Sequence, residues 1–465
     1  MYFTVVLAST RDGGIGYKGK LPWNIPRDME FFRRTTTREH GGVATALIMG
    51  RKTWESLPHR PLHERMNIVV TSSSVAEEGA MFVRTLDDAL AAAARCNCWP
   101  IVIGGAALFA DALSPARVTA RQCTIVYHTT VKTSYPHDVA FRYDFASAFA
   151  FQEVIDEDEE CCWTKYYGYN ATQHEEWAYL KLVHEILTRG NPRSVPSGAP
   201  PMETMAVFGR SLRFSLRDGT VPLLVTKRVF WKGVVEELLW FIRGCTDARE
   251  LAARGVHIWD ANASRAALDA RGFQDRDEGD LGPIYGFQWR HYGATYRGPH
   301  ACYDGEGVDQ LAALVNGIRA APHARTHLLT AWNPVTIPDM ALPPCHVLAQ
   351  FFVESGNATL SCMVYMRSSD VGLGLPFNMA SYALLTHLIA HVCKLVPWEL
   401  VLVLGDTHVY TAHIPGLRTQ LERVPCTPFP KVTLSASARL EDFTYERIVL
   451  EGYEPAQAIP LPLIV

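Results

Sequence analysis

The first third of this chain alternates short β-rich segments with helical ones, and that order constrains its fold more than any other feature. The expected strands are Thr4–Ser9, Ala46–Met49, Asn67–Thr71, Ile101–Ile103 and Thr124–Val131, and the expected helices lie near Pro26–Arg34 and Leu86–Arg95. Strands that alternate with helices build α/β domains, in which helices cover a largely parallel sheet. We therefore predict an α/β domain in this part of the chain.

The pattern changes near residue 170, where Gly168–Ala171 forms a polar break. Apolar residues then recur at helical spacing over Trp177–Leu187, which predicts a new helix. We place one domain at residues 1–169, a short junction at 170–176 and a second domain at 177–465.

Further elements of the second domain follow from local signals. Asn191–Pro201 is rich in proline and serine and is expected to be a loop. Trp231–Arg243 has helical periodicity and is followed by Gly244, a typical C-terminal cap. A second core helix is expected over Ser381–Leu395. The acidic run Asp156–Glu160, just before the junction, is expected to be a solvated hairpin loop.

Composition excludes several classes of protein. The net charge of −4 gives no long-range attraction to nucleic acids or anionic membranes, and no apolar run approaches the roughly 20 residues of a membrane span. The apolar start Met1–Ala8 meets Arg11 and Asp12 at once, so we interpret it as a strand and not a signal peptide. The 11 cysteines lack metal-ligand spacing. We expect a cytoplasmic protein with reduced thiols and no metal centre.

One glycine motif is misleading. Gly14, Gly16 and Gly19 match the pattern of dinucleotide-binding folds, which requires a helix to open directly at the glycines. Here the loop Lys20–Trp23 follows instead. We therefore reject that interpretation.

Asp28 is a candidate binding residue in the first predicted helix. It lies two residues after Pro26 and four before Phe32, so the carboxylate and the ring share one helix face. An acid beside aromatic side chains suits a flat heterocycle with a protonatable edge. A carboxylate that merely stabilises the helix N-terminus explains Asp28 equally well.

Five motifs, in order over about residues 1–168, resemble those of dihydrofolate reductases and favour the binding role. They are Leu21–Trp23 with Asp28, Ile48–Trp54, Arg60–Leu62 with Arg65–Val70, Ile101–Gly105, and Tyr127–Val131. The resemblance implies an α/β reductase fold with a mostly parallel central sheet and flanking helices. It also implies NADPH-dependent reduction of dihydrofolate.

The same resemblance implies residue roles. Asp28 would bind the pteridine and favour its protonation, Thr129 would hydrogen-bond Asp28, and Arg65 would pair with the folate glutamate. The expected folate-binding residues are Ala8, Asp28, Phe32, Arg65 and Thr129. The expected NADPH-binding residues are Ala8, Ile15, Gly50, Arg51, Lys52, Thr53, Thr71, Ser72, Gly104 and Gly105. Phe109 stands where these enzymes usually have a tyrosine.

Motifs from about Trp177 onward resemble those of thymidylate synthases. They are Leu224–Leu239, Asp280–Arg290, Thr330–Pro334, Met340–His346, Tyr365–Asn378 and Leu404–Tyr410. The resemblance implies an α+β fold and reductive methylation of dUMP by 5,10-methylenetetrahydrofolate through a covalent bond to Cys345. Without this context, Cys345 would be taken as a small buried hydrophobic residue.

The roles implied for this domain place Cys345, Glu237 and Tyr285 in catalysis. Arg367 would bind the phosphate and lower the pKa of Cys345. The expected dUMP-binding residues are Arg325, His346, Arg367, Ser368, Asp370, Asn378, His408 and Tyr410. The expected folate-binding residues are Lys227, Trp259, Asp370 and Gly374.

Three positions depart from the synthase pattern. Ala199 takes the place of a phosphate-binding arginine, Thr326 follows Arg325 where two arginines are usual, and Met366 replaces a glutamine. Arg193 could substitute for the missing loop arginine. Each charge-assisted hydrogen bond contributes about 1.5–3 kcal/mol, so our hypothesis is a functional synthase with weakened dUMP binding.

The two resemblances together imply one fused enzyme that acts as a homodimer through its synthase domain, with Arg325 serving the partner's site. The main alternative is an active reductase fused to a degenerate synthase that only holds the dimer together, an idea motivated by Ala199 and Thr326. A nucleic-acid-binding regulator is disfavoured because the sequence has no basic stripe with interleaved aromatic residues.

Overall fold

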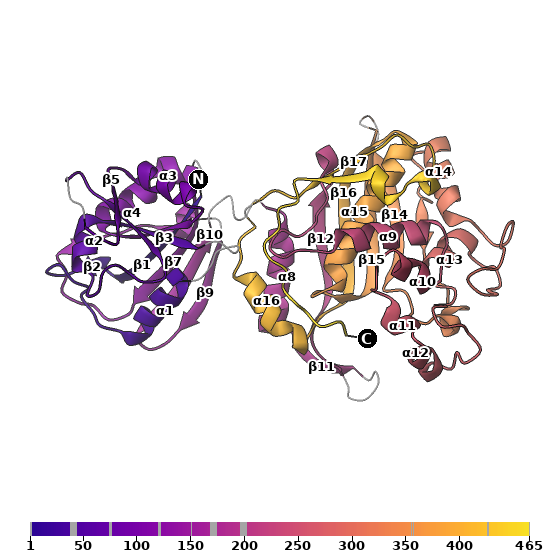
Figure 1. Cartoon of the computed structure of the whole chain (residues 1–465), viewed down its shortest axis with the longest axis horizontal. Coiled ribbons are helices and arrows are strands. Elements are labelled where there is room, and N and C mark those ends of the chain that lie inside the picture. Colours follow the sequence, from indigo (N-terminus) through magenta and orange to yellow (C-terminus); the bar gives the residue numbers. More distant parts are fainter. Residues whose placement is uncertain are drawn as a thin grey trace. The chain divides into compact units, whose positions relative to one another are not determined.

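The computed structural model describes residues 2–37, 44–73, 77–119, 122–149, 151–167, 174–195, 202–354, 356, 358–425 and 427–464. The chain forms two compact units (Figure 1). The first comprises Met1–Trp177 with Arg423–Cys426, and the second comprises Ala178–Glu422 with Thr427–Val465. Within the described ranges, no helix combines the length and the apolar character that crossing a membrane requires.

The first unit is built on an eight-stranded sheet of order β5-β4-β3-β6-β1-β7-β10-β9. The first six strands in this order run parallel, and β10 and β9 add two antiparallel partners. This confirms the α/β prediction. The strands are β1 (Phe3–Thr10), β3 (Thr45–Gly50), β4 (Met66–Val70), β5 (Met81–Val83), β6 (Trp99–Gly104), β7 (Cys123–Val131), β9 (Phe151–Glu157) and β10 (Cys161–Tyr167).

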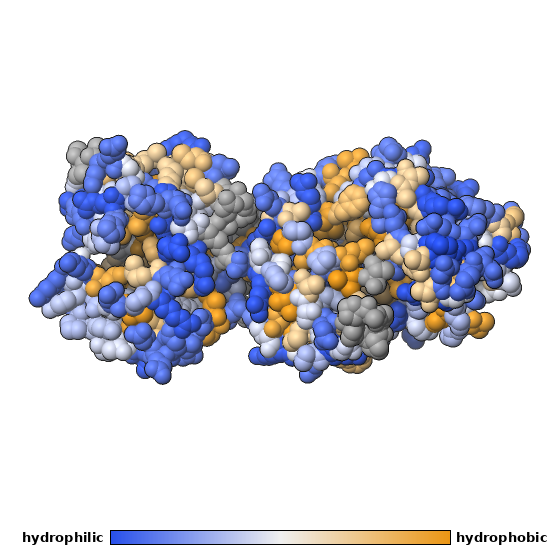
Figure 2. All heavy atoms as spheres, turned by 60° about the horizontal axis from the view of Figure 1, so that its bottom comes forward, coloured by the Kyte–Doolittle hydropathy of each residue, from blue (hydrophilic) through white to orange (hydrophobic). Residues whose placement is uncertain are grey.

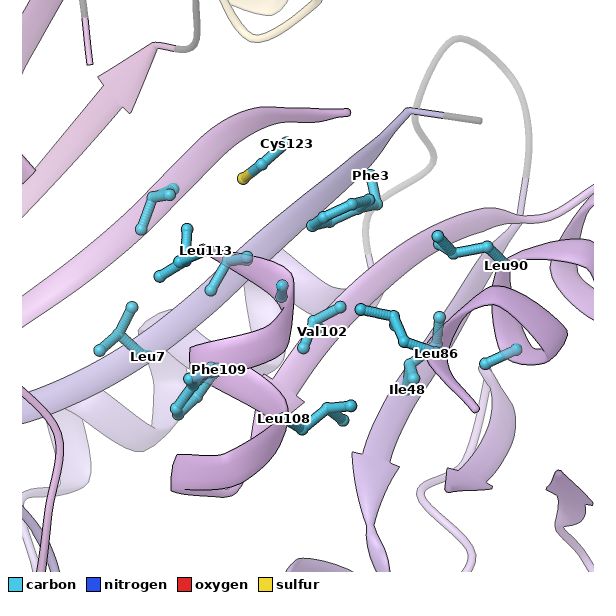
Figure 3. Close-up of a cluster of buried hydrophobic side chains, with 14 of the residues drawn as sticks. Phe3, Leu7, Ile48, Leu86, Leu90, Val102, Leu108, Phe109, Leu113 and Cys123 are labelled. Atoms are coloured by element: carbon cyan, nitrogen blue, oxygen red, sulfur yellow. The ribbon is translucent and has the colours of Figure 1, made fainter. Parts of the chain in front are cut away.

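Helices cover this sheet with apolar side chains. Helix α3 begins with a reciprocal capping box, in which the Thr85 hydroxyl accepts from the Asp88 amide and the Asp88 carboxylate accepts from the Thr85 amide. Leu86 and Leu90 of α3 and Leu108 of α4 point into the same buried cluster as Val102 of the sheet (Figure 3). The helices are α1 (Pro26–Thr37), α2 (Arg51–Ser56), α3 (Leu86–Arg95), α4 (Ala106–Ala112), α5 (Pro115–Thr119) and α6 (Phe145–Ala148).

The glycine motif rejected above forms a short strand. Strand β2 (Gly14–Gly16) pairs with β8 (Val139–Ala140), and the next helix begins only at Pro26. The absence of a helix directly after these glycines, within the described part of the chain, confirms that they are not a dinucleotide-binding turn.

The second unit contains a six-stranded mixed sheet of order β11-β12-β16-β15-β14-β13. Strands β15 and β16 are parallel and the other neighbours are antiparallel, which confirms the α+β prediction. The strands are β11 (Asn191–Val195), β12 (Met202–Ser215), β13 (Leu328–Thr330), β14 (His346–Glu354), β15 (Thr359–Asp370) and β16 (Val396–Tyr410), with β17 (Lys431–Leu434) and β18 (Ile448–Glu451) forming a separate pair.

One face of this sheet packs against α15 (Gly374–Cys393), which also contacts α9 and α14. Because α15 is enclosed by sheet and helices, 15 of its 20 residues are buried, and most of these are apolar. The other helices are α8 (Glu176–Arg189), α9 (Trp231–Ile242), α10 (Ala248–Ala253), α11 (Asp260–Ala263), α12 (Arg265–Ala270), α13 (Tyr285–His291), α14 (Gln310–Ala320) and α16 (Ile414–Leu421).

One predicted element of this unit was wrong, and one predicted helix is longer than expected. Asn191–Val195, expected to be part of a loop, is strand β11, because its backbone pairs in register with β12 in spite of Pro192. The predicted helix Ser381–Leu395 begins earlier, at Gly374. The Asp370 carboxylate accepts the amides of Gly372, Leu373 and Gly374, which satisfies donors at this helix start, and Pro376 is tolerated in a first turn.

Both units present many hydrophilic side chains, and hydrophobic ones gather on the face of the second unit seen in Figure 2.

Candidate functional sites

In the first unit, Asp28 is the centre of a buried group of side chains from three elements. It lies in the first turn of α1, and only 5% of it is exposed. Its Oδ1 accepts a hydrogen bond of 3.3 Å from Nε1 of Trp163 on β10. Thr129 of β7 is the register partner of both Trp163 and Ala8 of β1. Sheet pairing therefore gathers Ala8, Thr129 and Trp163 around the carboxylate.

Burial raises the pKa of Asp28, and hydrogen bonds from Thr129, Trp163 and Trp23 lower it in part. The net shift is upward, so the carboxyl holds its proton to a higher pH than an exposed aspartic acid does. A buried acid with a raised pKa can both bind a polar heterocycle and supply a proton.

Phe32 and Arg65 lie toward the other end of α1. Phe32 is half-buried one turn after Asp28. The Arg65 guanidinium donates to the Thr36 hydroxyl at 2.7 Å and to the His63 carbonyl at 2.9 Å, so its orientation is fixed beside the helix. An arginine held in this way suits recognition of a carboxylate.

The residues expected at NADPH gather at the carboxyl edge of the parallel strands, where ligands bind in open α/β sheets. Gly50–Thr53 follows β3, Thr71 and Ser72 follow β4, and Gly104 ends β6 next to Met49. A Cβ added to Gly105 would lie 3.2 Å from Thr53 Oγ1, which shows how closely these turns approach.

The side chains around these turns differ in exposure. Arg51 and Lys52 are exposed, whereas Ile15 of β2 and Ala8 of β1 are partly buried. Phe109, at the position where a tyrosine is usual, is buried and packs on Phe141 with ring centres 5.6 Å apart.

In the second unit, Cys345 lies directly before β14 and is half-buried. Its amide donates to the Tyr285 hydroxyl at 2.7 Å, and its carbonyl accepts from the Arg367 amide at 2.9 Å. The Arg367 side chain donates to the carbonyls of Pro343 and Pro344, each at 2.8 Å. Cys345, Arg367 and Tyr285 are thus brought together as expected.

The electrostatics at Cys345 differ from the sequence expectation. Arg367 and Tyr285 lower the pKa of the thiol, but burial has the larger effect and the net shift is upward. The expectation that Arg367 lowers this pKa is confirmed, but the sequence did not indicate the larger, opposite effect of burial. Burial has the larger effect because holding the thiolate away from water costs more free energy than its attraction to one guanidinium group supplies.

A buried cluster adjoins Cys345. Glu237 accepts a hydrogen bond of 2.7 Å from Trp259 Nε1, and burial raises its pKa to about 7. The His346 ring stacks on Tyr285 with centres 4.1 Å apart, and its Nδ1 lies 2.7 Å from the Tyr382 hydroxyl. Of these groups, Glu237 can take up or release a proton near neutral pH.

The loop after β15 binds its own backbone and a buried histidine. The Asp370 carboxylate accepts three amides at the start of α15 and lies 3.4 Å from Nδ1 of His413. These interactions lower the pKa of Asp370 in spite of its burial. Gly374 opens α15, and Asn378 lies one turn later and is half-buried.

Lys227, expected to bind the folate tail, lies beside the Asp370 loop. Its side chain is buried, and Nζ donates to the Gly372 carbonyl. Lys227 is therefore a structural support of this loop.

Strand β16 contributes His408 and Tyr410, whose rings meet edge to face at 5.2 Å. Asp406 is the register partner of Ser368, and its carboxylate contacts both Nδ1 of His408 at 3.1 Å and the Arg193 guanidinium. Arg193 therefore lies beside the expected nucleotide-binding residues.

The other residues named in the hypothesis of weakened dUMP binding lie away from Ser368 and Asp406 or outside the described residues. Arg325 and Thr326 are exposed before β13, at the opposite sheet edge from β11, so one chain does not bring them to Ser368. Met366 is fully buried. Ala199 lies outside the described residues.

Sequence reasoning missed three residues that contact the predicted ones: Trp163, Tyr382 and His413. Trp163 could have been found by pairing the strand Cys161–Tyr167 with that of Thr129. Tyr382 and His413 gave no local signal, because they reach the site only through tertiary packing.

Comparison with known proteins covers the whole chain. The dihydrofolate reductase family model matches residues 2–170, and the thymidylate synthase family model matches residues 177–465. The bifunctional dihydrofolate reductase-thymidylate synthase of Leishmania major is 43% identical over all of this chain and 95% of its own length. Those of Glycine max and Paramecium tetraurelia are 41% and 40% identical, again over all of this chain and over 95% and 99% of their own lengths. The chain belongs to the family of bifunctional dihydrofolate reductase-thymidylate synthases.

Proposed function

We propose that this chain catalyses two consecutive reactions of dTMP synthesis. The second unit converts dUMP and 5,10-methylenetetrahydrofolate into dTMP and dihydrofolate, and the first reduces dihydrofolate to tetrahydrofolate with NADPH. The observation that carries the proposal is that both chemical centres are assembled in one chain: Asp28 with Trp163 in the first unit, and Cys345 with Tyr285 and Arg367 in the second. The assembled second centre gives no support to a synthase that serves only as a scaffold.

We assign the reductase to residues 1–169 and the synthase to residues 177–465, with a junction at 170–176. Helix α8, which begins at Glu176, supports a new domain at this point. Residues 170–173 lie outside the described part of the chain.

In the reductase, the turns after β3, β4 and β6 fit a phosphorylated dinucleotide. Gly104 has a φ of +128° and a Cβ on Gly105 would crowd Thr53, so the backbone can approach a ligand closely. Arg51, Lys52, Thr53, Thr71 and Ser72 would hold its phosphates, and bound NADPH supplies the hydride. Asp28 would bind the pteridine ring and hold the proton that N5 of this ring receives.

We predict that Asp28→Asn slows dihydrofolate reduction about 10²–10⁴-fold at neutral pH, because the amide has no proton to give. The wild-type rate should fall as pH rises through the raised pKa of Asp28, since only the protonated acid is active. Stopped-flow measurement of the hydride-transfer rate against pH tests this. Glu30→Gln, an exposed carboxylate of the same helix, is the control. An unchanged pH profile in Asp28→Asn would contradict the role.

In the synthase, Cys345 as thiolate would form a bond to C6 of dUMP, and the C5–C6 π electrons would move toward O4. The resulting enolate would form a bond from its C5 to the methylene carbon of 5,10-methylenetetrahydrofolate, while one of that carbon's two bonds to folate nitrogen breaks and the nitrogen keeps the electron pair. Asn378 would hold the pyrimidine edge, and Glu237 and Tyr285 would transfer protons. The Glu237 pKa of about 7 suits this at neutral pH, because both of its protonation states are available.

Cys345→Ser should abolish dTMP formation, by roughly three or more powers of ten, because a serine hydroxyl does not ionise near neutral pH. The same protein should keep its NADPH-dependent reductase activity. Tritium release from [5-³H]dUMP measures the first activity, and Cys302→Ser, an exposed thiol, is the control. Equal turnover in Cys345→Ser and wild type would exclude covalent catalysis by this residue.

Ala199→Arg should strengthen dUMP binding about ten- to hundredfold, because it restores one charge-assisted hydrogen bond to the phosphate. Isothermal titration of the full chain measures this, and Ala199→Gln controls for side-chain length without charge. Equal dUMP affinity in wild type and Ala199→Arg would show that another cation, such as Arg193, already fills that role.

We also propose a homodimer through the synthase sheet and a cytoplasmic location, the latter supported by the ten described cysteines, all of which are free. The sheet face opposite α15 exposes Leu328, Phe352, Met363 and Tyr365, on strands β13, β14 and β15. The strand register places these four side chains on one face. Gln350 pairs with both Leu328 and Met363, Phe352 lies two residues from Gln350, and Tyr365 lies two residues from Met363. An apolar face of this kind is typical of a dimer interface.

Phe352→Arg should therefore weaken self-association at least about tenfold, because a charge would be buried in the interface. Sedimentation velocity over a concentration series measures this, with Val308→Arg as a control at an exposed valine of the same unit. Synthase activity should fall with dissociation, since Arg325 serves the partner's site. A wild-type chain that sediments as a monomer at micromolar concentration would refute the dimer.

A further inference from the structure

Tyr382 of helix α15 makes a hydrogen bond to a residue next to the nucleophile. It is 3% exposed, and its hydroxyl lies 2.7 Å from Nδ1 of His346, which directly follows Cys345. Among the described residues, the Tyr382 hydroxyl has this one hydrogen-bond partner. A buried hydroxyl requires an acceptor for its proton. The phenol is therefore the donor and Nδ1 the acceptor.

The ring of His346 is held on two sides. It stacks on Tyr285 at 4.1 Å with an interplanar angle of 23°, and Tyr382 meets it edge to face at 5.2 Å and 83°. Tyr285 in turn accepts the amide of Cys345. His346 thus has one fixed orientation relative to the nucleophile.

Both partners are neutral near pH 7. Burial lowers the pKa of His346 to about 3, and it raises the pKa of Tyr382 well above its usual value of 10. A neutral imidazole carries one proton, and which nitrogen carries it depends on the hydrogen bond made by the other.

We propose that Tyr382 is a positioning residue that fixes the tautomer of His346 with its proton on Nε2. This rests on the proposed synthase function, in which His346 belongs to the pyrimidine site. An Nε2–H donor would stabilise the negative charge that develops on the pyrimidine carbonyl when Cys345 adds to the ring. In the other tautomer, Nε2 would present a lone pair to the same oxygen and oppose the reaction.

The kinetic test uses Tyr382→Phe in the full chain. We expect kcat for dTMP formation to fall about tenfold with little change in the KM for dUMP, because one neutral hydrogen bond sets the tautomer. In a His346→Asn background, the same substitution should cost nothing further. Equal losses in both backgrounds would overturn the proposal, because they would mean that the Tyr382 hydroxyl acts independently of His346.

Controls separate this effect from misfolding. Tyr303→Phe removes another buried, hydrogen-bonded hydroxyl of the same unit and should leave synthase activity unchanged. Reductase activity of each variant reports the amount of folded chain. If Tyr382→Phe does not fold, Tyr382→Met, which also lacks the hydroxyl, should show the same dependence on His346.

A readout independent of activity separates this proposal from the proposed function. Nitrogen-15 NMR of histidine-labelled chain, assigned with His346→Asn, should show the His346 proton on Nε2 in wild type and a tautomer mixture in Tyr382→Phe. A wild-type proton on Nδ1 would overturn the inference even if dTMP is formed. The Nε2 tautomer in a chain without synthase activity would sustain the assignment and refute the function.

Discussion

Exclusion of water from a few ionisable side chains is the constraint on which both sites depend. Burial raises the pKa values of Asp28, Glu237 and Cys345 and lowers that of His346. Each shift follows from the cost of holding a charge away from water. In the second unit this cost falls on residues beside α15, a helix enclosed by sheet and helices. The packing that makes the core is therefore the same packing that tunes the chemistry.

Backbone groups, more than side-chain pairs, hold these sites in shape. The Arg367 guanidinium binds two proline carbonyls beside Cys345, and the Asp370 carboxylate binds three amides at the start of α15. Such contacts do not depend on the identity of the partner residue. A site built on them tolerates sequence change around it, provided that the chain keeps its path.

Sequence patterns correctly predicted those helices and strands whose apolar periodicity lies within the element itself. Helix Leu86–Arg95 agrees with the structure at both ends, and the sheet of the first unit was predicted from its alternating elements. The start of α15 was missed because Asp370, outside the periodic segment, supplies the cap. Strand β11 was missed because pairing with β12 outweighed its turn-like composition.

The acidic run Asp156–Glu160, expected to be a loop, lies partly in β9, at the open edge of the first sheet. Val154 and Ile155 of this strand are 58% and 41% exposed, a combination that invites strand addition by another polypeptide. Charged side chains beside these residues oppose such addition. Asp156 and Asp158 bind the Arg27 guanidinium at 2.6 and 2.5 Å, and Glu157 binds Lys132 at 2.7 Å, so a docking strand would have to desolvate these ion pairs. Charged side chains at this edge therefore act against aggregation, a property that neither reaction requires.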